Sequence, residues 1–163
     1  VLINQSIHTL DLIQWLGGKV DAIKGHVDTR VLQDVIEVED TAEATLYFAN
    51  GSRGLFYATN CFTTNSPVEI VIHGAKGMLK ITNDNLVLKQ NGEKQQLDHS
   101  KKSQYKSYWG LGHKSLISDF YNDILQDTSN CVDGKAGIAS LKLIEGIYKS
   151  SETNKKYRLN RES

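Results

Sequence analysis

The segment TAEATLYFANGSRGLFYATNCF, residues 41–62, decides the fold class of this chain of 163 residues. Apolar and polar side chains alternate over 41–48, which predicts a β-strand with one face toward a core. Asn50-Gly51 then predicts a tight turn, and 55–62 predicts the returning strand. Strands on so short a connection are antiparallel, since a parallel crossover needs about a dozen residues or more.

Further short elements are expected on both sides of this hairpin. Strands are predicted over 20–31, 68–73, 78–82, 86–90, a segment ending near Leu97, and an edge strand over 155–159, with Asn91-Gly92 as one more turn. Helices are predicted over 6–16, 113–125 and 135–151. The apolar side chains of the last helix that are expected to point inward are Ile138, Leu141, Ile144, Ile147 and Tyr148. Helices at both ends of a set of strands predict an α+β fold: a mostly antiparallel open sheet with helices on one face. Residues 1–163 are expected to form a single domain.

Composition excludes several classes of partner. The 19 basic and 19 acidic side chains cancel, so nucleic acid and anionic membrane surfaces are not expected partners. The apolar runs are shorter than a membrane span. The two cysteines, Cys61 and Cys131, are far apart and form no cluster at metal-ligand spacing, so free thiols and a cytoplasmic location are expected, without a metal.

The N-terminal segment NQSIHTLD, residues 4–11, holds the first candidate site residues. His8 and Asp11 are three residues apart, so on a helix a carboxylate lies one turn from an imidazole that titrates near neutral pH. Asn4 and Gln5 precede them as candidate substrate contacts. Two structural alternatives stay open: Asn4 or Ser6 is the helix N-cap, and His8 is an ordinary surface histidine paired with Asp11.

The polar segment 101–113 is the second candidate, because long loops within compact domains are often functional. Three aromatic side chains alternate there with three lysines, a combination that suits stacking on a sugar ring and holding an anion. Tyr108, Trp109 and His113 are the expected substrate contacts. A solvated loop without a ligand is the alternative.

An ordered series of motifs then carries a resemblance. NQSIHTLDL at 4–12, VED at 38–40, LYFANG at 46–51, HGAKG at 73–77, GH at 112–113, SDF at 118–120 and IYKSS at 147–151 resemble the C-terminal domain of the Gfo/Idh/MocA oxidoreductases, a fold similar to the C-terminal domain of glyceraldehyde-3-phosphate dehydrogenase. The resemblance implies a preceding Rossmann domain that binds NAD or NADP. No glycine fingerprint of such a domain occurs in this sequence.

The resemblance also implies roles for individual residues. The histidine at the position of His8 faces the nicotinamide and the reacting carbon, as acid/base or hydrogen-bond partner of the hydroxyl, and Asp11 supports it. Many members carry an aspartate where this chain has Asn4. An asparagine side chain cannot accept a proton as a carboxylate does, so Asn4 can only form hydrogen bonds. A catalytic lysine belongs to the preceding domain.

The expected function is therefore the substrate-binding and oligomerisation domain of an NAD(P)-dependent dehydrogenase. Its expected substrate is a secondary hydroxyl of a sugar, nucleotide sugar or cyclitol, and the isolated chain is expected to be inactive. The free face of the sheet is expected to form a homo-oligomer, a dimer or tetramer. A noncatalytic sensor or scaffold and a carbohydrate-binding module are the alternatives.

Overall fold

The computed structural model describes residues 1–64, 66–82, 85–98 and 112–159, which divide into two compact units. The first unit combines Val1–Ser66 with Gly134–Ser163, and the second is Pro67–Asp133. The chain therefore leaves the first unit after three of its strands and returns to it with its last helix.

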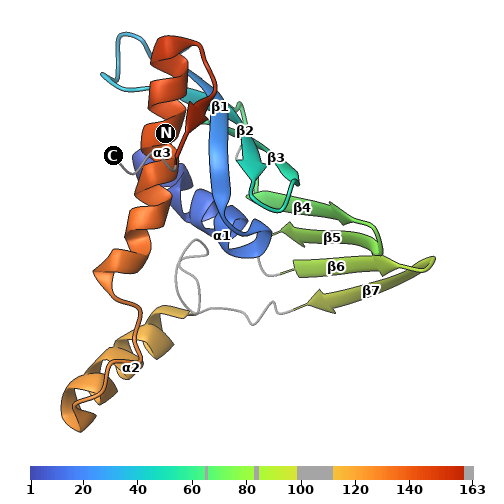
Figure 1. The fold of residues 1–163 in the computed structure, drawn as a ribbon, viewed down its shortest axis with the longest axis vertical. Coiled ribbons are helices and arrows are strands. Elements are labelled where there is room, and N and C mark those ends of the chain that lie inside the picture. The colour runs from blue at the N-terminus through green and yellow to red at the C-terminus, as the bar shows by residue number, and fades with distance from the viewer. Residues whose placement is uncertain (65, 83–84, 99–111, 160–163) are drawn as a thin grey trace. The chain divides into compact units, whose positions relative to one another are not determined.

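The first unit contains a four-stranded antiparallel sheet in the order β3-β2-β1-β8 (Figure 1). Its strands are β1 (Val20–Asp28), β2 (Thr41–Phe48), β3 (Arg53–Thr59) and β8 (Tyr157–Arg158). The predicted hairpin is confirmed, with Ala44 opposite Phe56 in the register of β2 and β3. The first strand ends three residues earlier than predicted, at Asp28, because the following residues form a loop that returns to Asp40, whose N–H donates to the Asp28 carbonyl.

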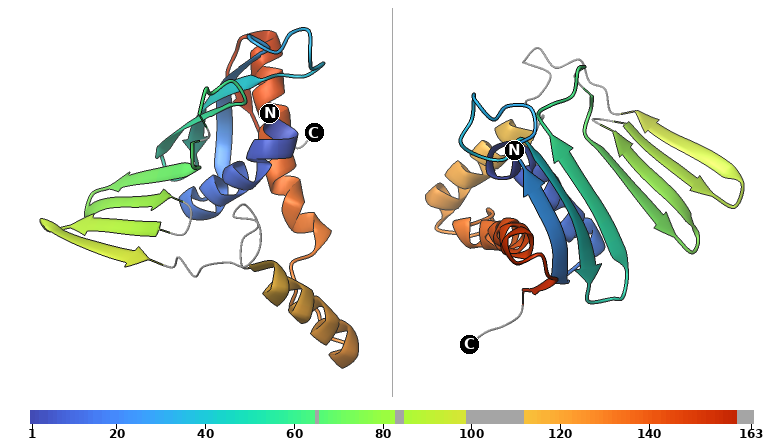
Figure 2. Two further views of the ribbon diagram at one scale, coloured as in Figure 1. Left: turned by 180° about the vertical axis from the view of Figure 1, so that it is seen from behind. Right: turned by 90° about the horizontal axis from the view of Figure 1, so that it is seen from above.

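Two helices cover the same face of this sheet, as the right-hand view of Figure 2 shows. A π-helical turn η1 (Leu2–Ser6) leads into α1 (Ile7–Gly17), and a short 3-10 turn η2 (Gly134–Gly137) leads into α3 (Ile138–Thr153). Their apolar stripes meet the sheet in one core, whose fully buried side chains include Leu2, Leu10, Ile23, Leu46, Leu143 and Ile147. Helices on one face of an antiparallel sheet confirm the predicted fold class.

Two side chains predicted to point into the core from α3 do not do so. Ile138 and Leu141 remain 48% and 47% exposed. The buried stripe of α3 instead follows Ser140, Leu143 and Ile147, spaced three and four residues apart as one face of a helix requires. The prediction was wrong at these two positions because they lie off that stripe.

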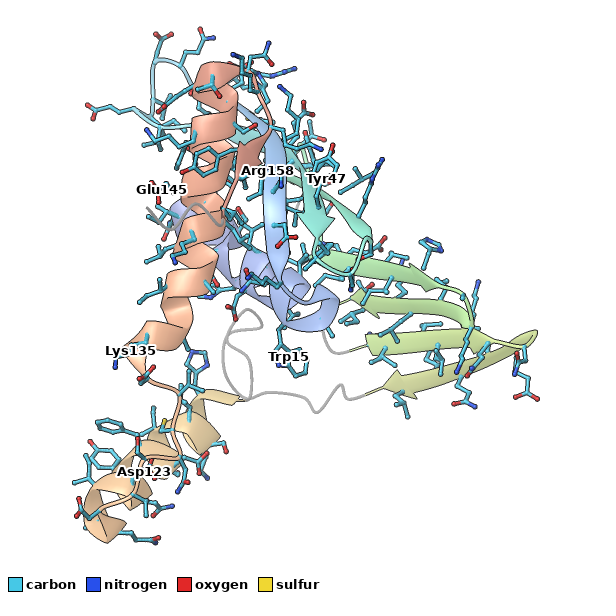
Figure 3. All side chains as sticks on the ribbon, viewed as in Figure 1. Trp15, Tyr47, Asp123, Lys135, Glu145 and Arg158 are labelled. Carbon is cyan, nitrogen blue, oxygen red and sulfur yellow. The ribbon has the colours of Figure 1, made fainter. Side chains whose placement is uncertain are left out.

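The opposite face of the first sheet is open. Leu55 and Tyr57 on β3 are 86% and 60% exposed there. Tyr47 lies on the same face (Figure 3). The Lys156 ammonium lies 3.6 Å from the centre of the Tyr47 ring, and the Arg53 guanidinium lies 5.4 Å from it. These contacts let Tyr47 hold two cations on an exposed surface.

The second unit contains a separate meander of strands and the helix α2. The strands are β4 (Glu69–Gly74), β5 (Gly77–Thr82), β6 (Asn85–Gln90) and β7 (Glu93–Asp98), paired antiparallel in that order. Asn91 and Gly92 both have positive φ, the turn geometry that this dipeptide predicts. One cross-strand row consists of Ile70, Ile81, Leu86 and Leu97. The sheet therefore has one aliphatic face.

The sequence predicted one sheet, whereas the described strands form two. Residues 60–68 separate β3 from β4, and they include Pro67, which has no N–H to donate to a neighbouring strand. The helix α2 (Gly112–Gln126) matches its predicted position, and among its described residues none is buried. Within the described parts of the chain, no helix has both the length and the apolar character needed to span a membrane.

Candidate functional site

The candidate site begins with the π-helical turn that precedes α1. The Ser6 N–H donates to the Val1 carbonyl at 3.2 Å, five residues back, which is the π-helical pattern. Leu2 and Ser6 are buried, while Asn4 and Gln5 are exposed. Such turns are rare and often occur at functional sites. The sequence pattern predicts a helix that begins near Ser6 and gives no sign of this turn.

His8 lies in the first turn of α1 with an exposed imidazole. Asn4 is four residues earlier, and both side chains are solvent-accessible. In the described part of the chain, the imidazole forms no hydrogen bond or ion pair, so its two nitrogens are free to meet a ligand. Leu10 is fully buried on the other side of the same helix and holds α1 against the core. The site therefore combines an open imidazole with a fixed backbone.

Asp11 contacts α3. Its Oδ1 accepts a hydrogen bond of 2.5 Å from the Ser140 hydroxyl. Among the described residues the Asp11 carboxylate forms no hydrogen bond or ion pair with His8, and its bond to Ser140 joins α1 to α3. Ser6 occupies the N-cap position of α1, as one of the alternatives expected, but its hydroxyl donates to the Val1 carbonyl at 3.0 Å and makes no side-chain capping bond. Asn4 lies inside η1 and is not the cap.

Glu39 is a buried carboxylate that the sequence analysis overlooked. Its Oε1 accepts hydrogen bonds from the Leu2 N–H at 2.7 Å and the Val1 nitrogen at 2.9 Å, and its Oε2 accepts one of 2.8 Å from the Tyr148 hydroxyl. Burial opposes its ionisation, but these donors outweigh burial and lower the pKa of Glu39. In the sequence, the VED motif of residues 38–40 contributes only to the family resemblance, since nothing in the sequence shows how near Leu2 and Tyr148 lie to Glu39.

Tyr148 responds to the same contact. Burial, then the hydrogen bond to Glu39 and its negative charge, raise the pKa of the Tyr148 phenol above its ordinary value. The phenol therefore remains a hydrogen-bond donor at every physiological pH.

Three further predicted contacts come later in the chain: Tyr108, Trp109 and His113. His113 is the second residue of α2, in the second unit, and is exposed. Tyr108 and Trp109 lie outside the described residues. Trp15, which is not among the predicted site residues, projects from α1 and is 78% exposed (Figure 3). His8 and Trp15 are seven residues apart, about two helical turns, so they lie on one side of the helix.

A hollow of about 350 Å³ lies on the opposite, open face of the first sheet. His26, Asp28, Arg30, Glu43 and Tyr57 are among the side chains that line it, and His8 is not. Because α1 packs on the other face, this hollow is separate from the candidate site. Among the described residues, no cluster of His, Cys, Asp or Glu is arranged to hold a metal ion.

The fold of the first unit defines an α+β domain, in which helices pack against one face of an antiparallel sheet. The family model described as the oxidoreductase family, C-terminal alpha/beta domain, matches residues 1–159. The chain therefore belongs to the Gfo/Idh/MocA oxidoreductases and corresponds to their C-terminal domain. A search of curated protein sequences found no significant match.

Solved structures agree with this assignment. An Agrobacterium radiobacter oxidoreductase, in complex with NAD+, L-tartaric acid and magnesium, has a TM-score of 0.78 at 19% identity over 98% of this chain and 49% of its own. The WlbA dehydrogenase of Bordetella pertussis, in complex with NADH and UDP-GlcNAcA, has a TM-score of 0.77 at 25% identity, over 96% of this chain and 47% of its own. Levoglucosan dehydrogenase, in complex with NADH and levoglucosan, has a TM-score of 0.77 at 19% identity, over 97% of this chain and 50% of its own. This chain spans about half the length of each of these proteins.

Proposed function

We propose that this chain is the substrate-side domain of an NAD(P)-dependent dehydrogenase that oxidises a secondary hydroxyl of a sugar, nucleotide sugar or cyclitol. Membership of an oxidoreductase family supports the reaction class. The structures of relatives with NADH and either UDP-GlcNAcA or levoglucosan support the substrate class. The observation that carries the proposal is the exposed imidazole of His8, which has no hydrogen-bond partner among the described residues, on a helix whose other side is buried.

His8 suits the proton that this oxidation releases. Removing hydride from a secondary alcohol leaves a proton on its oxygen, and a group that titrates near neutral pH is suited to accept it. In this proposal His8 accepts or shares that proton. Asn4, one turn earlier, offers an amide that donates and accepts hydrogen bonds to neighbouring hydroxyls. Gln5 offers the same groups, and Tyr108, Trp109 and His113 remain proposed substrate contacts.

The described residues do not fit the diphosphate of a dinucleotide. Their strands pair antiparallel, and none is followed by a glycine-rich turn that opens a helix, which is the usual cradle for that group. Nicotinamide cofactors supply hydride transfer when bound. We propose that the described residues serve the proton side of the reaction and that NAD or NADP is held mainly by residues outside this chain, so that the isolated chain is inactive.

We further propose that the open face of the first sheet joins copies of the chain into a dimer or tetramer. Leu55 is 86% exposed on this face, and single-sided antiparallel sheets often bury their second face against a partner. Arg53 and Lys156 lie around Tyr47 toward one end of the face, and Glu43 lies toward the other. Two copies in opposite orientation would pair these ends. The free Cys61 and Cys131 agree with a cytoplasmic location.

The test is reduction of NAD+ and NADP+ by the full natural chain that carries residues 1–163, across a panel of sugars, nucleotide sugars and cyclitols. His8→Ala is expected to lower turnover by about a hundredfold, the scale of a lost acid/base group. His73→Ala, which removes an exposed histidine from β4, is the matched control and should retain wild-type turnover. Unchanged turnover in His8→Ala would refute the proposed role of His8. Absence of turnover and of cofactor binding in the wild-type protein would favour a noncatalytic scaffold.

A further inference from the structure

We infer that two carboxylates, Glu39 and Asp11, clamp the His8 helix to α3 and thereby set the direction of the His8 imidazole. We call the two hydrogen bonds from α3, Tyr148 to Glu39 and Ser140 to Asp11, the helix clamp. Both hydroxyls belong to α3, and the two carboxylates act on the chain on either side of His8. The inference rests on the proposed function, because it assigns these residues as positioning residues for that reaction.

The first half of the clamp acts before His8. Glu39 is 7% exposed, and it joins three parts of the chain by accepting hydrogen bonds from the backbone at Leu2 and from the Tyr148 hydroxyl. Leu2 opens the π-helical turn that leads into α1. The carboxylate therefore does for this helical segment what a capping side chain does, from a residue 37 positions away.

The second half of the clamp acts after His8. Asp11 is three residues beyond His8 and one turn along α1, and the Ser140 hydroxyl reaches its Oδ1 at 2.5 Å. Ser140 is itself buried, at 3% exposure. A hydrogen bond from a buried hydroxyl to a carboxylate is directional and is stronger than one between neutral groups.

The apolar contacts of α1 do not replace these bonds. Leu2 and Leu10 are fully buried and hold the helix against the core, but apolar burial is nondirectional and tolerates rotation of a helix about its axis. Hydrogen bonds on both sides of His8 oppose that rotation. A displacement of about 1 Å at a reacting group costs roughly a hundredfold in rate, so a small rotation is sufficient to lower turnover.

Two mild substitutions remove the α3 half of each bond and leave α1 unchanged: Tyr148→Phe and Ser140→Ala. The double variant in the full natural chain is expected to lose at least about tenfold in kcat with KM changed by less than about threefold, because binding groups remain while the reacting geometry is lost. Tyr121→Phe, an exposed tyrosine of α2, is the matched control and should match the wild-type protein. Glu39→Gln, with the exposed Glu37→Gln as its control, tests the carboxylate directly.

Amide hydrogen exchange of residues 2–12 supplies a readout that does not depend on turnover. The double variant is expected to exchange faster there than Tyr121→Phe, with the amides of β2 unchanged. Faster exchange together with lower kcat supports the clamp. A double variant with the kcat of the wild-type protein overturns the clamp, whatever its exchange rates are. A lower kcat without faster exchange also overturns it, because the loss of rate then does not arise from a change in the helix.

The two proposals fail in different ways. If the wild-type protein shows no turnover on the whole panel, the proposed dehydrogenase function falls. The clamp is then judged by hydrogen exchange alone: faster exchange of residues 2–12 in the double variant supports it, and exchange equal to that of Tyr121→Phe overturns it.

Discussion

Glu39 and Asp40 are adjacent in the chain, yet their buried carboxylates bind different parts of the first unit. Glu39 binds the start of the His8 helix and α3, whereas Asp40 Oδ2 accepts hydrogen bonds from the backbone N–H groups of Arg30, Val31 and Leu32 at 2.8–3.0 Å. The loop between β1 and β2 is thus held by a side chain at its own end.

This arrangement predicts a loss of stability in acid. Burial opposes ionisation of Asp40, but the three backbone donors outweigh it and hold the pKa of Asp40 well below its usual range. A carboxyl group with a lowered pKa in the folded state stabilises the protein above its unfolded pKa, about 4, and that contribution is lost as pH falls below it. Urea unfolding at several pH values between 7 and 2 is expected to show the unfolding free energy decreasing below about pH 4. Asp40→Asn should flatten this dependence, whereas Asp34→Asn, on the exposed part of the loop, should not.

The core of the first unit predicts unequal effects of two substitutions in α3. Ile147 is fully buried and Leu141 is 47% exposed. Ile147→Ala is expected to lower the unfolding free energy by about 2–5 kcal/mol, since it removes apolar contacts and leaves a cavity. Leu141→Ala should cost about 1 kcal/mol or less. Equilibrium denaturation of both variants checks this prediction, and equal costs would show that the buried stripe of α3 is misassigned.

The turn between β4 and β5 predicts that Gly77 cannot be replaced. Its φ is +154°, and a Cβ there would lie 2.2 Å from the Lys89 carbonyl oxygen of β6. Gly77→Ala should destabilise the second sheet by more than about 1 kcal/mol. Gly74→Ala is the control, because the nearest atom to its Cβ is 3.8 Å away. Circular dichroism and thermal unfolding of the two variants provide the measurement.

The open face of the first sheet predicts that Leu55→Glu weakens self-association. A charge placed at the centre of an apolar contact is expected to raise the dissociation constant by at least about tenfold. Sedimentation velocity over a range of concentrations measures the effect. Val35→Glu, at a position 75% exposed on the β1–β2 loop, is the control. A wild-type protein that stays monomeric would contradict the proposed interface.

The local patterns in the sequence were sufficient for the elements but not for their contacts. Alternation over 41–48 and the Asn91-Gly92 dipeptide predicted β2 and the β6–β7 turn correctly, because these features depend on neighbouring residues. The exposed His8 was found through its motif. The residues of the helix clamp were not found in this way, because Glu39, Tyr148 and Ser140 meet the His8 helix only through tertiary packing. The division into two sheets likewise depends on which strands pair and not on the pattern within any one strand.

The first unit is built from two stretches of chain with the second unit inserted between them, and this order matters during synthesis. The sheet formed by residues 20–59 has no cover from α3 until residues 138–153 have been made, so Ile23 and Leu46 lack their partner Ile147 until that helix has been synthesised. At about 5–20 residues per second, this interval lasts several seconds. A chain terminated early, anywhere before α3, therefore leaves the ribosome with an uncovered apolar sheet and becomes a substrate for chaperones and proteases.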